Sequence, residues 1–180
     1  YDGKCYRDGI DITSKDIYAI QDEKLIKTSS PVGEDLFSLL DQLKEKGYTH
    51  LIGLFLSGGI SGTSNQMRLF CQTYDRLTCH VVDSQSASVG LGIIAIALAK
   101  YREEGRSFEE LVRIADELCH QNYAYFSIDD LNYLQKGGRI GKASAFLGTT
   151  LKIKPILSFE KEKGEIYIPS KVRGSKKVKS

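Results

Sequence analysis

The sequence predicts an α/β fold, with a parallel sheet in an N-terminal domain followed by the start of a second α/β domain. Residues 51–56 and 79–82 are short runs that favour strands, and each leads into a hydroxyl-rich turn and then a helical pattern. Residues 123–128 form a third run of this kind after another helical segment. Strands that alternate with helices are typical of parallel sheets, because parallel neighbours need a long crossover between them.

Two capping boxes mark helix starts in this pattern. Thr13 with Asp16, and Ser107 with Glu110, have the three-residue spacing at which side chains and backbone amides satisfy one another. A short helix should follow the first box. A longer helix should follow the second and reach about His120.

A helix is also expected after Pro31, a residue that favours the first turn. Residues 36–43 place leucine and phenylalanine on one helical face, and Gly47 provides a C-terminal stop. The hydroxyls of Thr28 and Ser29 precede this helix. One interpretation of both residues is therefore simple N-capping.

The most informative stretch is a strand followed by a glycine-rich loop. Residues 51–56 are apolar and uncharged, as in a strand buried on both faces. Residues 57–64 contain three glycines among serine and threonine hydroxyls, and helical spacing then resumes at Met67, Phe70, Tyr74 and Leu77. Ligands of open α/β sheets bind at this end of the strands, and a helix N-terminus favours an anion.

Two other interpretations of this loop remain open. Turns of this composition are common without any ligand. Ser61, between Gly59 and Gly62, also resembles a nucleophile elbow, but that motif needs glycine where Thr63 stands. A serine hydrolase or acyltransferase would further need a base beside Ser61. We assign no such role to the three histidines, which are His50, His80 and His120.

Residues 83–88 form a second hydroxyl-rich turn after a strand. Residues 89–98 are apolar nearly all round, which predicts a buried helix. The sequence around Gly90 and Gly92 matches a dinucleotide-binding fingerprint. These glycines, however, lie inside the helical pattern and not in the turn that follows the strand. We therefore expect no dinucleotide cofactor.

The character of the chain changes near residues 129–145, where we place a domain boundary. The predicted N-terminal α/β domain covers residues 1–135, and the second domain begins with residues 136–180. Within the second part, residues 153–159 and 165–169 flank a short polar turn, which predicts an antiparallel hairpin.

Charge is distributed unevenly between these two parts. Residues 136–180 carry 12 Lys/Arg and 3 Asp/Glu, a balance of +9, whereas residues 1–135 have a balance of −7. A basic region can meet an acidic partner or a phosphate, although surface lysines are often only solvated. We expect no nucleic-acid binding, because the basic residues are not interleaved with aromatic ones.

The four cysteines form no Cys-x-x-Cys pair and have no histidine at ligand spacing. This predicts no metal site and four reduced thiols in a cytoplasmic protein. The spacing of the cysteines leaves a disulfide between two of them as an alternative. No apolar run reaches ~18 residues, so we expect no stable membrane insertion. The chain begins with Tyr1, and we expect it to be a piece of a longer protein.

Six short motifs give the chain a family resemblance. They are Lys27-Thr-Ser-x-Pro31, the Ser-Gly-Gly-Ile-Ser-Gly-Thr run at 57–63, Val82-Asp-Ser-x-Ser86, Lys136-Gly-Gly-Arg-Ile140, Lys152-Ile-Lys-Pro-Ile156 and Val172-Arg-Gly174. In this order and spacing they resemble the DegV family of bacterial proteins, which bind long-chain fatty acids. The resemblance implies two α/β domains with the acyl chain buried between or within them. It also implies a strand upstream of residue 1 and a head-group histidine beyond residue 180.

The resemblance implies a role for each matching residue. The fatty acid carboxylate would be held by the hydroxyls of Thr28 and Ser61, with Arg139 helping to hold the head group. The same site would include Ser29, Gly62 and Thr63. Two hydroxyl donors beside a helix N-terminus suit a carboxylate.

Members of the family present the acid to a fatty acid kinase, which makes an acyl phosphate. By this resemblance the chain would be a carrier for phospholipid metabolism without turnover of its own, and its ligand would be the acid with no cofactor. Lys142 and Arg173 would then meet the kinase or the phosphate. Residues that could line an apolar tunnel for the acyl tail are Phe55, Ile60, Ile93 and Phe146.

Overall fold

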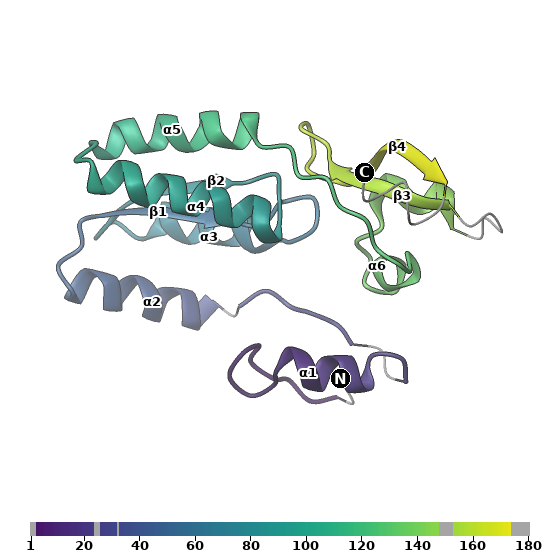
Figure 1. Cartoon of the computed structure of the whole chain (residues 1–180). Helices are drawn as coiled ribbons and strands as arrows, with labels where there is room; N and C mark the ends of the chain where they lie inside the picture. The colour runs from purple at the N-terminus through teal and green to yellow at the C-terminus, as the bar shows by residue number, and fades with distance from the viewer. Residues whose placement is uncertain (1–2, 24–25, 32, 148–152, 174–180) are drawn as a thin grey trace.

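The computed structural model describes residues 3–23, 26–31, 33–147 and 153–173. Helices and two strands make up the first two thirds of the chain, and a hairpin follows after two further short helices (Figure 1). The elements are α1 (Ser14–Ile20), α2 (Gly33–Glu45), β1 (His50–Phe55), α3 (Thr63–Thr73), β2 (Thr78–Asp83), α4 (Ser88–Glu103), α5 (Phe108–Gln121), α6 (Asn132–Lys136), the 3₁₀ helix η1 (Gly141–Phe146), β3 (Ile153–Phe159) and β4 (Ile166–Arg173).

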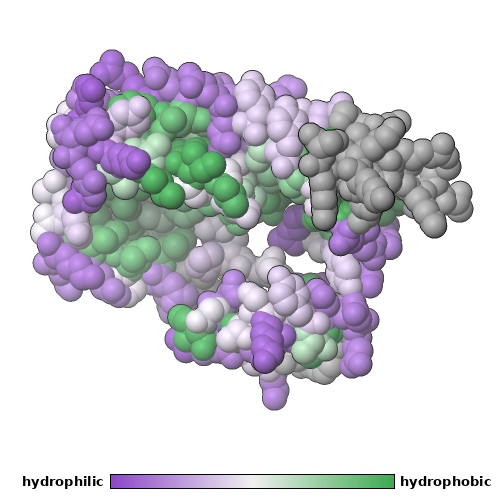
Figure 2. Space-filling model, in the orientation of Figure 1, coloured by the Kyte–Doolittle hydropathy of each residue, from purple (hydrophilic) through white to green (hydrophobic). Residues whose placement is uncertain are grey.

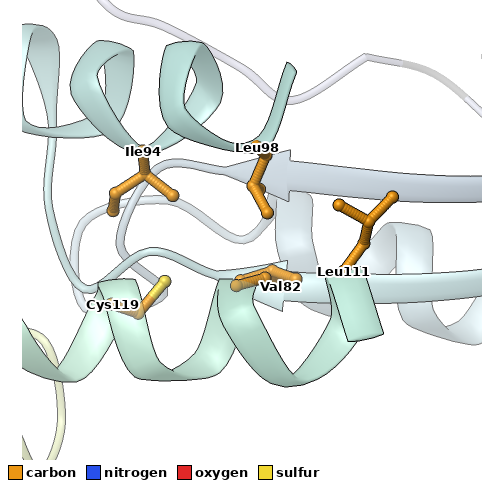
Figure 3. Packing of buried hydrophobic residues seen from close by; sticks show 6 residues of the cluster. Val82, Ile94, Leu98, Leu111 and Cys119 are labelled. Atoms are coloured by element: carbon orange, nitrogen blue, oxygen red, sulfur yellow. The ribbon is translucent and has the colours of Figure 1, made fainter. Parts of the chain in front are cut away.

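Strands β1 and β2 pair in parallel, as predicted, from His50 opposite Thr78 to Phe55 opposite Asp83. Successive side chains of a strand point to opposite faces, so both strands contribute to two separate cores. On one face, Val82 packs with residues of α4 and α5 (Figure 3), and Ile52 and Leu54 pack against the same cluster. On the other face, the residues that pack with α2 and α3 are Leu51, Phe55, Cys79 and Val81. Burial on both faces explains why residues 51–56 carry no charge.

The third strand predicted at residues 123–128 does not join this sheet. Within the described ranges the parallel sheet has two strands, and Phe126 makes a single antiparallel bridge to Leu157 of β3. Its ring lies 5.5 Å from that of Phe159, measured between centroids. The prediction was wrong because the apolar residues of this segment pack on the hairpin and not beside β2.

Helix α4 forms where predicted, but its predicted burial on all sides is wrong. Three of its apolar side chains, Val89, Ile93 and Ile96, are 72%, 59% and 61% exposed. The sheet and α5 cover only one side of α4, where Ile94 and Leu98 are buried. The opposite side has no covering element among the described residues.

The predicted hairpin is confirmed, and its second strand is longer than expected. Strands β3 and β4 pair antiparallel from Ile153 opposite Arg173 to Phe159 opposite Ile166. Leu157, Phe159 and Ile166 form a third core with Ala143 of η1. This core also takes in apolar residues of the 124–134 segment and of the loops after β1 and β2. The hairpin is therefore joined to the ends of the parallel strands.

The predicted helix starts divide into two groups. Both capping boxes form, with Thr13 accepting from Asp16 and Ser107 accepting from Glu110. Helix α2, however, begins only at Gly33, so Thr28 and Ser29 lie too far upstream to cap it. The capping interpretation of these two hydroxyls is therefore wrong.

Candidate functional site

The loop between β1 and α3 is a tight turn that ends at a helix N-terminus. The carbonyl oxygen of Ser57 accepts hydrogen bonds from the amides of Ile60 (3.0 Å) and Ser61 (3.1 Å). Gly62 is the N-cap of α3 and has no side chain with which to cap it. This helix end therefore has no side-chain acceptor from its N-cap residue and suits an external acceptor, as at many anion sites.

Three hydroxyls gather at this turn, and we call them the hydroxyl cluster. Ser61 Oγ and Thr63 Oγ1 lie 3.0 Å apart, and the Thr63 amide donates to Ser61 Oγ at 3.3 Å. Thr63 Oγ1 donates to Ser30 Oγ at 3.2 Å. All three residues are partly buried, so their hydroxyls are held in place yet reachable from outside.

Ser30 was not among the predicted site residues. It is the third hydroxyl of the Thr28–Ser30 run, and that clustering was the signal that could have found it. The Ser30–Thr63 hydrogen bond ties this run to the loop although the two lie 33 residues apart in sequence. Thr28 and Ser29 are exposed directly beside Ser30 along the chain. The structure thus brings both predicted segments together.

Arg139 supplies a positive charge next to the same loop. It follows α6, is partly buried, and donates from Nε to the carbonyl oxygen of Ile60 at 3.2 Å. Its Nη1 donates to the carbonyl oxygen of Gly137. A guanidinium has five N–H donors, so these two contacts leave others for an anion.

Asp83, at the end of β2, holds the β1–α3 loop through hydrogen bonds to its backbone. Its carboxylate accepts from the Gly58 amide at 3.1 and 3.0 Å and from the Gln85 amide at 2.9 Å. A Cβ at Gly58 would lie 2.5 Å from Asp83 Oδ2, so only glycine fits this approach. Sequence reasoning placed Asp83 in a family motif but did not assign it this role.

The side-chain hydrogen bonds of Ser61 run to Thr63, and none to a histidine or lysine occurs in the described ranges. His50, at the start of β1, instead bonds Thr49 Oγ1 at 2.8 Å and packs on Phe108. A serine nucleophile needs a base within hydrogen-bond reach. The geometry therefore gives no support to the hydrolase interpretation.

The predicted partner residues lie on the hairpin side of the molecule. Lys142 forms an ion pair with Glu160. The hydrogen bond from Lys142 Nζ to the Glu160 carboxylate raises the pKa of the lysine. The backbone of Arg173 pairs at the end of β4, and its side chain lies outside the described part of the chain. Much of the charge of Lys142 is therefore balanced within the protein.

The four predicted tunnel residues lie in different parts of the described structure. Phe55 packs in the core between β1 and α2–α3, whereas Ile60 packs against the hairpin core. Ile93 is on the exposed side of α4, and Phe146 is partly buried at the end of η1.

A groove of about 410 Å³ does occur elsewhere, along β1. Its walls come from β1, α4 and α5 and include Ile52, Leu54, Leu98 and Leu111. Hydrophobic residues are exposed on the face of the molecule that Figure 2 shows. None of the predicted head-group residues is among those that line it.

Cys5, Cys71, Cys79 and Cys119 are all free thiols. In the described ranges no three His, Cys, Asp or Glu side chains come together as metal ligands. No helix of those ranges combines the length and the apolar character that a membrane span needs.

Comparison with known proteins agrees with this architecture. The DegV family of uncharacterised proteins matches residues 1–180. A DegV domain-containing protein of Clostridium acetobutylicum is 36% identical over 176 residues, which make up 98% of this chain and 62% of the relative. The chain thus spans less than two thirds of that relative's length.

Two solved structures resemble the fold closely. A fatty acid binding DegV family protein from Streptococcus agalactiae has a TM-score of 0.88 at 35% identity, over 98% of this chain and 63% of that one. A DegV family protein from Thermus thermophilus, described by its fatty acid binding, has a TM-score of 0.85 at 34% identity, over 97% and 62% of the two chains.

Proposed function

Since the chain belongs to the DegV family, we propose that it is the part of a carrier that holds the carboxylate of a long-chain fatty acid. The observation that carries this proposal is the hydroxyl cluster at the N-terminus of α3, with Arg139 beside it. Solved relatives of the same fold bind fatty acids.

The chemistry of the loop suits a carboxylate. An ionised carboxylate only accepts hydrogen bonds, and hydroxyls, backbone amides and a guanidinium are all donors. In this arrangement Ser61 and Thr28 donate from two segments, with Ser29, Gly62 and Thr63 completing the wall. Arg139 compensates the negative charge, and the α3 N-terminus adds its partial positive charge.

We further propose that the bound acid is presented to a cytoplasmic kinase, which transfers a phosphoryl group to the carboxylate. The carrier would add no catalytic base of its own, in keeping with the surroundings of Ser61. Lys142 and Arg173 would contribute to the surface that the kinase meets.

Ligand titration tests the head-group assignment. Thr28→Ala and Ser61→Ala should each weaken binding of a long-chain fatty acid by about 1.5–3 kcal/mol, the range for hydrogen bonds to a charged group. Thr73→Ala is a matched control, because this hydroxyl is at the opposite end of α3 and bonds Phe70 O. Mass spectrometry of co-purified small molecules would identify the acid.

Unchanged affinity in both variants would disprove the carboxylate assignment. Rapid ester hydrolysis by the native chain that is lost in Ser61→Ala would support a serine hydrolase instead. Hydrolysis should otherwise stay at the level of the buffer.

Kinase kinetics test the partner surface. Charges at an interface rim mainly steer encounter, so replacing Lys142 and Arg173 by alanine should slow acyl-phosphate formation at low salt and leave fatty acid affinity unchanged. Glu160→Gln frees the charge of Lys142 and should have the opposite effect on the rate. Equal rates for all these proteins at low salt would show that the charges are merely solvated.

A further inference from the structure

Ser57 of the β1–α3 loop is held through its amide, its carbonyl oxygen and its hydroxyl. It is fully buried, its amide donates to Ser86 O at 2.9 Å, and its carbonyl oxygen accepts from Ile60 and Ser61. Its side chain joins this turn to the hairpin, because Ser57 Oγ donates to Gly164 O at 2.7 Å and accepts from the Gly59 amide at 3.4 Å. One residue therefore connects the Ser61 amide to the turn of the β3–β4 hairpin.

The hairpin turn fits closely against Ser57. Gly164 has a φ of +68°, and a Cβ there would lie 2.1 Å from Ser57 Oγ. A Cβ on Gly59 would lie 2.3 Å from the Gly164 carbonyl carbon. Glycine at both positions is thus required for the approach, as well as for the left-handed backbone at Gly164.

The same turn is itself held firmly. Gln85 Nε2 donates to Lys161 O at 2.6 Å, and Lys161 Nζ donates to Cys119 O and Asn122 O at the C-terminal end of α5, both at 2.6 Å. Burial lowers the pKa of Lys161. The turn is therefore a fixed support, against which Ser57 can hold the loop.

We propose that Ser57, through its contact with Gly164, is a positioning residue for the head-group site, so that the hairpin turn sets the place of Ser61. This inference rests on the proposed function. Hydrogen bonds weaken steeply with misalignment, and a binding site must keep its donors within ~0.5 Å of the productive geometry. A shift of Ser57 moves the Ser61 amide that bonds to it.

A double-mutant cycle with Ser57→Ala and Ser61→Ala tests this inference. Loss of a buried hydrogen bond that places the loop should weaken fatty acid binding about tenfold in Ser57→Ala. If Ser57 acts through Ser61, the double variant should bind no more weakly than Ser61→Ala alone. Ser158→Ala, which removes another fully buried serine hydroxyl from β3, is the matched control and should leave affinity unchanged.

Additive losses, or an equal loss in Ser158→Ala, would overturn the inference by showing a general structural effect. Affinity lost in Ser61→Ala but kept in Ser57→Ala would overturn it while leaving the proposed function intact. Ser57→Cys, which nearly keeps the volume but has a weaker donor, replaces Ser57→Ala in the cycle if the alanine variant does not fold.

Amide hydrogen exchange provides a test that needs no ligand. The Ile60 and Ser61 amides should exchange about tenfold faster in Ser57→Ala, because their acceptor is no longer anchored to the hairpin. Gly164→Ala should have the same effect, and Ser158→Ala should not. If the Ile60 and Ser61 amides exchange at the native rate in both Ser57→Ala and Gly164→Ala, the positioning role is overturned. This outcome is decisive even for a native chain that binds no fatty acid.

Discussion

The loops after β1 and β2 are built from similar residues but are used differently. Both follow a parallel strand, both are rich in serine, and both lead into a helix. Ser61 and Thr63 of the first loop are only partly buried, whereas Ser84 and Ser86 of the second are fully buried. The first loop buries Ser57 but leaves Ser61 and Thr63 partly exposed, whereas the second buries both Ser84 and Ser86.

The second loop supports the first through the Ser86 carbonyl oxygen and the Asp83 carboxylate. Ser84 Oγ donates to Ser86 O at 3.2 Å, and the same carbonyl oxygen accepts from the Ser57 amide. Asp83 holds Gly58 in the first loop and Gln85 in the second. Hydroxyl content thus identifies both loops as polar, whereas burial separates the hydroxyls that a ligand can reach from those that it cannot.

The largest effect that separates the two loops should come from Asp83→Ala. This variant leaves the Gly58 and Gln85 amides without their acceptor, which should lower the free energy of unfolding by about 2–4 kcal/mol. Chemical denaturation would measure the loss. Asp75→Ala, in the exposed turn before β2, is the control and should stay close to native stability.

Smaller effects should distinguish Ser84→Ala, which should change stability, from Thr63→Ala, which should change fatty acid affinity. Ser84→Ala removes a buried hydrogen bond and should lower stability by about 0.5–1.5 kcal/mol while retaining fatty acid affinity. Thr63→Ala should lower affinity with little change in stability. Paired denaturation and titration would check both, and a loss of affinity in Ser84→Ala alone would reverse the roles assigned to the loops.

The smallest effect should be a change in the free energy of unfolding at alkaline pH. It concerns the thiol of Cys71, where α3 packs on β2. Burial, with a hydrogen bond to Cys79, raises the pKa of Cys71 to about 12 from an ordinary value near 9. The folded state therefore keeps the thiol protonated, and its contribution to stability is full below pH ~9 and is lost as the pH rises toward 12.

Cys71→Ala should accordingly show a flatter decline of unfolding free energy between pH 9 and 11 than the native chain, beginning from a lower value at pH 8. Cys5→Ala, at an exposed position, should leave the native slope unchanged. Parallel curves for the native chain and Cys71→Ala would contradict this origin of the pH dependence.

Several features follow from the sequence alone, because they depend on residues close together in the chain. The capping boxes at Thr13 and Ser107 need only a three-residue spacing, and the stop at Gly47 needs only a positive φ, which is +86°. The two parallel strands and the hairpin follow from short apolar runs between turns. The ordered motifs were enough to identify the family.

Other features were decided only by tertiary structure. Residues 123–128 have strand character, but the bridge of Phe126 to Leu157 depends on where the hairpin lies. Apolar periodicity predicted α4 but not its exposed side, because the number of covering elements is not a local property. The Ser57–Gly164 and Ser30–Thr63 contacts join segments 107 and 33 residues apart. No local pattern encodes such contacts, since a hydroxyl has the same chemistry whether folding turns it inward or leaves it facing a ligand.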